Sequence, residues 1–245
     1  LENCKFIDSS YGIRPLGGTQ HYNNCTISDR ELDYGDLITF EDYPCAYYIN
    51  GKTFVSEGVS KDINGEYYVS SKVGLKYFSN KTADNGTVIN LDSDIDFGNE
   101  EFQAVAAGYS KSLVFKGHGH TIKNIKLVQC AHNSVGAASM FFCYPGGSIT
   151  VEELVIDNAT SKGATYAGTI LGYTQGDARL SNITVQNSNI EGTKKIGGLV
   201  GFVEASTTSF VAENCHIINT SVTATEKQAG TILGYNAKPA TLKQC

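Results

Sequence analysis

The chain has 245 residues, of which 41% are hydrophobic and 18% are charged, and its formal net charge is −6. This apolar content can bury a core, which excludes an intrinsically disordered chain, and the acidic balance excludes the basic face that a nucleic-acid partner requires. No apolar run approaches the roughly 18 residues that span a bilayer, so we expect no membrane insertion.

Residues 1–45 contain two short words of one pattern, "LENCKF" from Leu1 and "YNNCTI" from Tyr22. Glycine outnumbers proline 26 to 4 and tryptophan is absent, a composition that favours strands and tight turns. We interpret residues 1–45 as the terminal rungs of a preceding β-helix.

Residues 46–69 are predicted to form a hairpin-like linker, because Asn50-Gly51 and Asn64-Gly65 are typical of tight hairpin turns. A short helix is expected near residues 70–80, with Ser70 or Ser71 as its N-cap. Its apolar residues are Val73, Leu75, Tyr77 and Phe78. Such a helix would cover the open end of a β-helix, whose unpaired backbone otherwise invites aggregation.

The remaining chain repeats a six-residue motif of the same pattern, here called a word. Its copies are "IKNIKL", "VEELVI", "LSNITV" and "AENCHI". Its Asn-like position falls at Asn124, Glu153, Asn182, Asn214 and Gln244, in steps of 153−124 = 29, 182−153 = 29, 214−182 = 32 and 244−214 = 30. A second word repeats in register with the first. Its equivalent positions are Cys143, Gly172, Gly201 and Gly234. Periods of this length indicate a solenoid.

We therefore predict an all-β fold in which residues 70–245 form a capped, right-handed parallel β-helix with rungs of about 29–33 residues. A buried structural column is expected from Ile125, Leu154, Ile183 and Cys215. Asn tolerates the left-handed conformation that bends a strand. The predicted bend column is Asn3, Asn24, Asn124, Asn182 and Asn214.

The cysteines of these words fall in the apolar column at Cys4, Cys25, Cys215 and Cys245. We interpret them as free thiols that pack as small hydrophobic groups. A disulfide between neighbouring rungs is the alternative, with Cys4 and Cys25 as its first candidate pair.

Two groups of residues have the letters of a metal site. His118 and His120 lie two apart in "GHGHT", and Asp92, Asp94 and Asp96 lie in "LDSDIDF". The second group lacks the glycine and distal glutamate of an EF-hand, and a strand with a polar outer face predicts the same alternation. We expect no metal and no cofactor.

Catalytic residues are also not expected. Carbohydrate-cleaving β-helices need clustered carboxylates on one outer face, whereas the equivalent positions here are Thr, Ser, Gln and Asn, with Lys194 and Lys195 in a single turn. The chain is predicted not to be an enzyme.

The run "IGGLVGFVEASTTSFVAENCHIINTSVTA" resembles the GLUG-type repeat of adhesin-like cell-surface proteins of gut bacteria. The segment from "YYVSSKVGLKYFSN" to "FKGHGHTIKNIKL" is similar to the entry segment that precedes such repeats. One difference is that "KGHGHT" replaces the usual Asp-Gly-Asn-Gly-His-Thr. The resemblance covers about residues 51–245 and implies a β-helix at the cell surface. It implies no catalytic motif.

Two functions remain open. The first is a non-enzymatic extracellular structural or adhesive module that forms one segment of a longer stalk or fibre. Its expected partners are like segments stacked end to end or adjoining parts of a longer chain. A glycan or host-surface ligand is a further possibility. The alternative is a carbohydrate-binding or carbohydrate-processing β-helix domain of the lyase, glycosidase or phage tailspike kind. Because both ends fall within a rung word, we expect a fragment or a stacking unit. The plain Thr/Ser/Asn face favours the first function.

Overall fold

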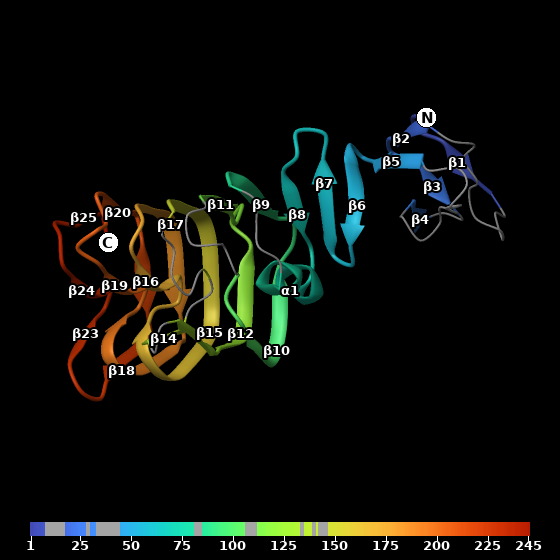
Figure 1. The fold of residues 1–245 in the computed structure, drawn as a ribbon. Helices are drawn as coiled ribbons and strands as arrows, with labels where there is room; N and C mark the ends of the chain where they lie inside the picture. The colour runs from blue at the N-terminus through green and yellow to red at the C-terminus, as the bar shows by residue number, and fades with distance from the viewer. Residues whose placement is uncertain are drawn as a thin grey trace.

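The computed structural model describes residues 1–7, 18–27, 30–32, 45–80, 85–105, 112–132, 135–138, 141 and 147–245. These residues form an elongated β-solenoid of about six turns, with the N- and C-termini at opposite ends (Figure 1). Within the described residues one helix occurs, and it is too short and too polar to cross a membrane.

The N-terminal strands pack around a small core of their own. They are β1 (Lys5–Phe6), β2 (Gly18–Tyr22), β3 (Thr26–Ile27) and β4 (Arg30–Glu31). Strand β1 pairs with β3, and β2 pairs with the later strand β5 (Cys45–Ile49), both in parallel. The core of these strands consists of Tyr22, Cys25, Ile27, Leu32 and Ile49.

An antiparallel meander connects these strands to the larger solenoid. It consists of β5, β6 (Lys52–Ser56), β7 (Val59–Asp62) and β8 (Tyr67–Val69). Asn50 and Gly51 have φ of 50° and 78° and form the two-residue turn between β5 and β6. Strand β8 then pairs in parallel with the first strand of the solenoid, β9 (Thr87–Leu91).

Helix α1 (Lys72–Asn80) begins where the Ser71 hydroxyl accepts a hydrogen bond of 3.1 Å from the Gly74 N–H. Leu75 and Phe78 are buried and belong to the core of the solenoid, which the helix covers at its N-terminal end (Figure 1). Val73, expected on the same face, is 42% exposed, because it lies on the opposite side of the helix.

The larger solenoid repeats its strands coil by coil. Its further strands are β10 (Ile95–Phe102), β11 (Leu113–Lys116), β12 (Thr121–Leu127), β13 (Gln129–His132), β14 (Val135–Ala138), β15 (Ile149–Ala167), β16 (Leu171–Thr174), β17 (Ala178–Gln186), β18 (Asn189–Gly197), β19 (Val200–Val203), β20 (Phe210–Glu213), β21 (His216–Ile218), β22 (Ser221–Ala224), β23 (Gln228–Gly230), β24 (Leu233–Asn236) and β25 (Thr241–Lys243). One parallel track runs through β9, β11, β15, β17, β20 and β25.

Equivalent side chains stack along this track and form the core. The stacked residues are Ile89, Phe115, Val151, Leu180 and Ala212, each with no exposed surface. A third sheet, β16-β19-β24, packs closely against β18. A Cβ atom at Gly201 would lie 2.5 Å from the Gly172 carbonyl oxygen, so this second repeated word needs glycine where two backbones meet.

Each complete coil bends twice through the left-handed region. The first bend contains Glu153, Asn182, Asn214 and Gln244, with φ between 51° and 55°, and the second contains Asn99, Asn124, Asn158, Asn187 and Asn219, with φ between 47° and 64°. Asn3 and Asn24 have φ of 50° and 51° in the N-terminal strands. Side-chain amides link neighbouring bends: Asn214 Nδ2 donates to Asn182 Oδ1 at 2.8 Å, and Asn158 Nδ2 to Asn124 Oδ1 at 2.7 Å.

The existence of two bends corrects the predicted columns. Leu154 lies opposite Ile183, and both are buried, but Ile125 lies opposite Ala159. Asn124 likewise belongs to the second bend, where its partner is Asn158 and not Glu153. The reason is that both bends have the same apolar-x-Asn-apolar pattern.

The four cysteines of the repeated word are free thiols, and Cys4 and Cys25 are not bridged. Cys25 and Cys215 are buried, Cys4 is half-buried and Cys245 is exposed. Burial raises the pKa of the Cys215 thiol to about 11, so it stays protonated and packs as a small apolar group at neutral pH. Cys143, assigned to the second word, lies outside the described residues.

Candidate functional site

Asp94 and Asp96, two of the predicted metal candidates, fasten one coil to the next. Asp94 Oδ1 accepts a hydrogen bond of 2.9 Å from the Thr121 N–H and lies 3.1 Å from His120 Nδ1. Asp96 Oδ1 accepts from Asn124 Nδ2 at 2.8 Å. The Thr121 N–H, followed by His120, holds the pKa of Asp94 below its usual range, so this carboxylate is ionised where it joins the two coils.

The other candidates point to different partners. Asp92 forms an ion pair of 2.7 Å with Lys52, and His118 Nε2 lies 2.8 Å from Asn90 Oδ1. The structure therefore brings Asp94 and His120 together but separates His118 from them. Among the described residues, no three His, Cys, Asp or Glu side chains are arranged to hold a metal ion.

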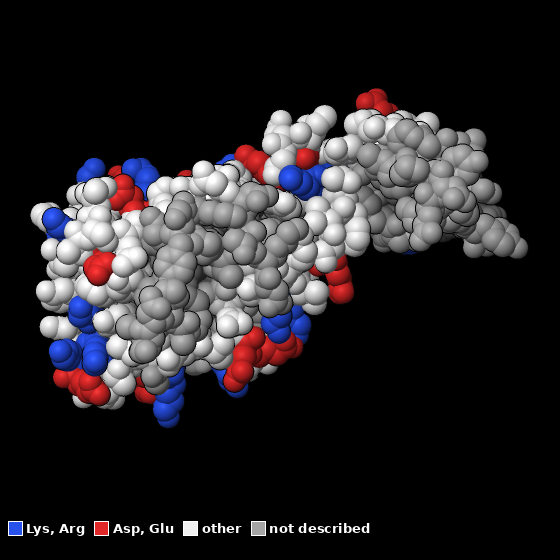
Figure 2. All heavy atoms as spheres, viewed as in Figure 1, with Lys and Arg blue, Asp and Glu red and all other residues white. Residues whose placement is uncertain are grey.

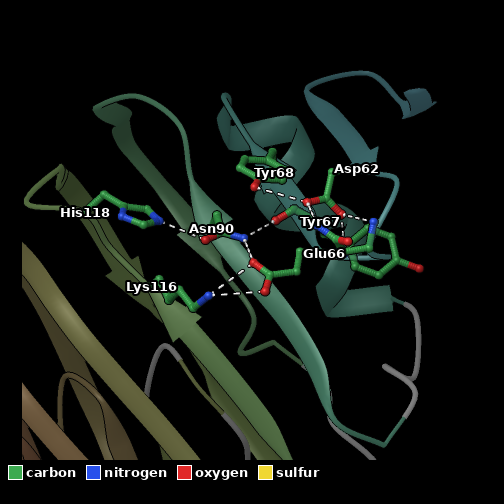
Figure 3. Close-up of polar contacts among 8 residues, drawn as sticks. Asp62, Glu66, Tyr67, Tyr68, Asn90, Lys116 and His118 are labelled. Carbon is green, nitrogen blue, oxygen red and sulfur yellow. Dashed lines mark hydrogen bonds and ion pairs between the residues drawn. The ribbon is translucent and has the colours of Figure 1, made fainter. Parts of the chain in front are cut away.

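A polar cluster that includes the predicted site residue His118 lies where the meander meets the first two coils. We call Glu66, Asn90, Lys116 and His118 the junction cluster (Figure 3). Asn90 lies on β9 and Lys116 on β11, where they are direct register partners. Glu66 comes from the turn before β8 and reaches both, because β8 pairs with β9 in parallel.

Glu66 is the centre of the junction cluster. Its Oε2 accepts a hydrogen bond of 2.9 Å from Asn90 Nδ2 and lies 3.2 Å from Lys116 Nζ. Asn90 Nδ2 also lies 3.2 Å from the Tyr67 carbonyl oxygen. The hydrogen bond from Asn90, together with Lys116, holds the pKa of Glu66 below its usual range despite partial burial, so the group is a carboxylate at neutral pH.

Asp62 organises the turn that presents Glu66. Its Oδ1 accepts from the backbone N–H groups of Asn64 and Glu66, both at 2.9 Å, which fixes the turn between β7 and β8. Tyr68 O–H donates to Asp62 Oδ2 at 3.5 Å (Figure 3). Burial, followed by the charge of Asp62, raises the pKa of Tyr68, which keeps this hydroxyl protonated.

An open groove of about 450 Å³ crosses several coils on the outside of the solenoid. One row of its lining is in strand register, with Glu101, Lys126, Thr160 and Asn189 on four successive coils. Gln129, Lys162 and Glu191 also line it. We call it the cross-coil groove, and its walls offer hydrogen-bond donors and acceptors at the spacing of stacked strands, roughly 4.8 Å.

Aromatic rings of β16, β19 and β24 lie next to one another in edge-on and tilted contacts. Tyr173 and Phe202 have ring centroids 5.2 Å apart, and Phe202 and Tyr235 5.6 Å apart. Lys195 Nζ lies 3.3 Å from the Phe202 centroid and 4.3 Å from that of Tyr235. Burial among these rings, followed by repulsion from Lys227, lowers the pKa of Lys195. Tyr173 is buried, whereas Tyr235 is 39% exposed.

Charge does not gather into one patch on the described part of the face in view. Figure 2 shows Lys and Arg interspersed with Asp and Glu along the edges of the molecule. An example is Glu100, which forms ion pairs with both Lys72 and Lys76 of the helix. These hydrogen-bonded ion pairs lower the pKa of Glu100 to about 2.

Sequence reasoning missed Glu66, Asn90 and Lys116. Lys116 and Asn90 lie one coil apart, 116−90 = 26 residues, which is shorter than the steps of the repeated word. Their apolar neighbours in "TVINL" and "LVFK" are the signal that could have aligned them. The position of Glu66 depends on the fold of the meander and has no such signal.

Comparison with known proteins finds similarity to a solved structure. No family model and no curated protein matches the chain. The chain is similar to a crystal structure named "putative immunoglobulin A1 protease from Bacteroides ovatus", with 18% sequence identity and a TM-score of 0.43. The similarity covers 74% of this chain and 65% of that one.

Proposed function

We propose that this chain is a non-enzymatic structural module of the cell surface, one segment of a longer stalk or fibre with GLUG-like repeats. The main support is that polar side chains hydrogen-bond between coils. Asp94, Asp96 and Asn124 each bind the equivalent part of a neighbouring coil. Side chains committed in this way resist separation of the coils. An extracellular location and partners of like segments or adjoining chain are part of the proposal, supported by the resemblance to surface repeats.

Single-molecule pulling between handles on the two termini tests this proposal. Mechanical unfolding should proceed in steps, because each coil contacts mainly its neighbours. Asp94→Ala combined with Asp96→Ala should lower the force at which the coils of β10 and β12 separate, since it removes the ties to Thr121 and Asn124. Glu226→Ala, at an exposed position before β23, is the control and should leave that force unchanged.

Two results would contradict this proposal. If the purified chain cleaves polysaccharide or polypeptide substrates with multiple turnovers, the non-enzymatic proposal is wrong. If the double substitution leaves the unfolding forces of all coils unchanged, the ties between coils do not have the mechanical role proposed for them.

A second candidate function is glycan binding in the cross-coil groove. An extended saccharide offers hydroxyl groups in a row, and the groove presents Lys126, Thr160 and Asn189 in a row on three successive coils. Thr160→Ala combined with Asn189→Ala should weaken binding of a glycan found by array screening about tenfold, which is about 1.4 kcal/mol. Thr184→Ala, outside the groove, is the matched control, and equal affinities of all three proteins would contradict the assignment.

A further inference from the structure

Lys116 and Asn90 lie side by side on two neighbouring coils. They are direct register partners on the parallel strands β11 and β9. Register partners point to the same face and have backbones roughly 4.8 Å apart. Asn90 is 2% exposed, while the Lys116 side chain is 29% exposed, so an amine lies beside a buried carboxamide.

The Asn90 carboxamide is held at both ends. Its Oδ1 lies 2.8 Å from His118 Nε2, and its Nδ2 donates to Glu66 Oε2 and to the Tyr67 carbonyl oxygen. With the Nε2 tautomer of His118, the imidazole N–H donates to Oδ1 and withdraws electron density from the carbonyl carbon. The same Glu66 oxygen that binds Nδ2 lies 3.2 Å from Lys116 Nζ.

We propose that Lys116 and Asn90 join spontaneously as a side-chain amide, with Glu66 as the proton carrier and His118 as the oxyanion donor. The Lys116 Nζ–Asn90 Cγ bond forms and the Asn90 Cγ–Nδ2 bond breaks. The lysine ammonium and the carboxamide become one secondary amide and one ammonium ion, so atoms and charge balance without an oxidant or a further reactant.

The residues of the junction cluster have different roles in this reaction. Glu66, ionised at neutral pH, accepts a proton from the Lys116 ammonium, which frees the nitrogen lone pair for attack on Cγ. His118 stabilises the negative charge that develops on Oδ1. Glu66 then returns the proton to Nδ2, which it already contacts, and ammonia leaves. Glu66 transfers the second proton that Nζ loses to the departing ammonia, which becomes the ammonium ion. Because the two strands hold the reactants together, the step is intramolecular and gains the rate advantage of proximity.

The amide would tie β9 to β11, the first two coils of the larger solenoid, at the place where the meander joins them. A bond formed once in the life of the molecule needs no turnover, so this activity is compatible with a chain that is not an enzyme.

Mass spectrometry of the purified 245-residue chain tests the proposal. The expected result is an intact mass lower by one ammonia, together with a cross-linked peptide pair containing residues 90 and 116 after digestion. The cross-linked pair decides, because the Asn-Gly sequences at Asn50, Asn64 and Asn85 can also lose ammonia as succinimides. An intact mass lower by one water, with a cross-linked pair containing residues 66 and 116, would instead indicate a Lys116–Glu66 amide and would overturn the proposal.

Substitutions separate the roles. Lys116→Arg keeps the charge beside Glu66 but removes the nucleophile, so the cross-linked pair should disappear. Glu66→Gln should slow its formation at least about tenfold, followed as cross-linked fraction against time. Lys123→Arg, at a lysine 3.6 Å from Asp96, is the matched control and should leave the cross-link intact.

The proposal is overturned if the wild-type chain, incubated at about pH 9, yields the peptides of residues 90 and 116 as separate species. It is also overturned if Lys116→Arg retains the cross-link. The mass readout concerns the amide alone, so its failure leaves the pulling experiment on the surface module unaffected.

Discussion

Single residues at the bends determine where each strand turns. Asn182 has a φ of 54° and its side chain accepts a hydrogen bond from Asn214 in the next coil. Asn is preferred there because the left-handed conformation costs most other residues about 1–2 kcal/mol. Glu153 and Gln244 adopt the same φ without that advantage, which indicates that stacking of the strands imposes the bend on them.

Asn182→Ala should therefore destabilise the chain by about 2 kcal/mol, the sum of the backbone cost and one lost hydrogen bond. Asn182→Gly loses the hydrogen bond but tolerates the φ, so its loss of unfolding free energy should be smaller. Urea titrations of both variants provide the measurement. Equal losses would mean that the backbone conformation is not the reason for asparagine at this position.

Side chains next to the bend alternate between core and solvent. Ile183 has no exposed surface, whereas its neighbour Thr184 is half-buried on the outer side. Ile183→Ala should cost about 2–5 kcal/mol through the cavity it leaves, and Thr184→Ala about 0.5 kcal/mol or less. Similar midpoints of urea unfolding for the two variants would contradict this assignment of inner and outer faces.

At the scale of elements, turns between strands depend on carboxylates that accept several hydrogen bonds. Asp177, just before β17, accepts from the backbone N–H of Thr208 at 2.9 Å, from that of Ser209 at 2.7 Å and from the Thr208 hydroxyl at 2.6 Å. The Thr208 hydroxyl, followed by the Ser209 N–H, lowers the pKa of Asp177 from its ordinary value of 3.8. The ionised form thus joins the start of β17 to the loop before β20.

The sign of the pH dependence follows from this lowered pKa. Stability from Asp177 is fully present above the unfolded pKa of 3.8 and is lost as pH falls through the lower folded pKa. Asp177→Asn should therefore be less stable than wild type at about pH 7, and the difference should shrink at about pH 2. Urea unfolding at both pH values measures it, with Glu226→Gln as an exposed control. A difference that stays constant or grows in acid would contradict the assignment.

At the scale of the whole molecule, the N-terminal strands and the larger solenoid have separate hydrophobic cores, the first small and the second large. Tyr22, Cys25 and Ile49 belong to the small N-terminal core, whereas Val151 and Leu180 belong to the core of the larger solenoid. In a solenoid, stability is transmitted mainly between neighbouring repeats. The two cores should therefore open independently of each other.

Tyr22→Ala should increase amide hydrogen exchange in residues 18–27 and leave protection of residues 149–203 unchanged. Leu180→Ala, the reciprocal variant, should increase exchange around β15, β17 and β20 without affecting β2. Hydrogen exchange followed by mass spectrometry makes both measurements. A uniform increase across the chain in either variant would show that the cores unfold as one unit.

The sequence alone determined the kind of fold, the pairing of Leu154 with Ile183 and the left-handed conformation of the asparagines in the predicted bend column, because each depends on a local pattern repeated coil after coil. It did not determine to which bend Asn124 belongs, since the two bends of a coil look alike and only strand register distinguishes them. Only the tertiary structure shows that the residues of the junction cluster lie together. Glu66 reaches Asn90 and Lys116 through the fold of the meander and a shortened first coil, and neither follows from the period of the repeat.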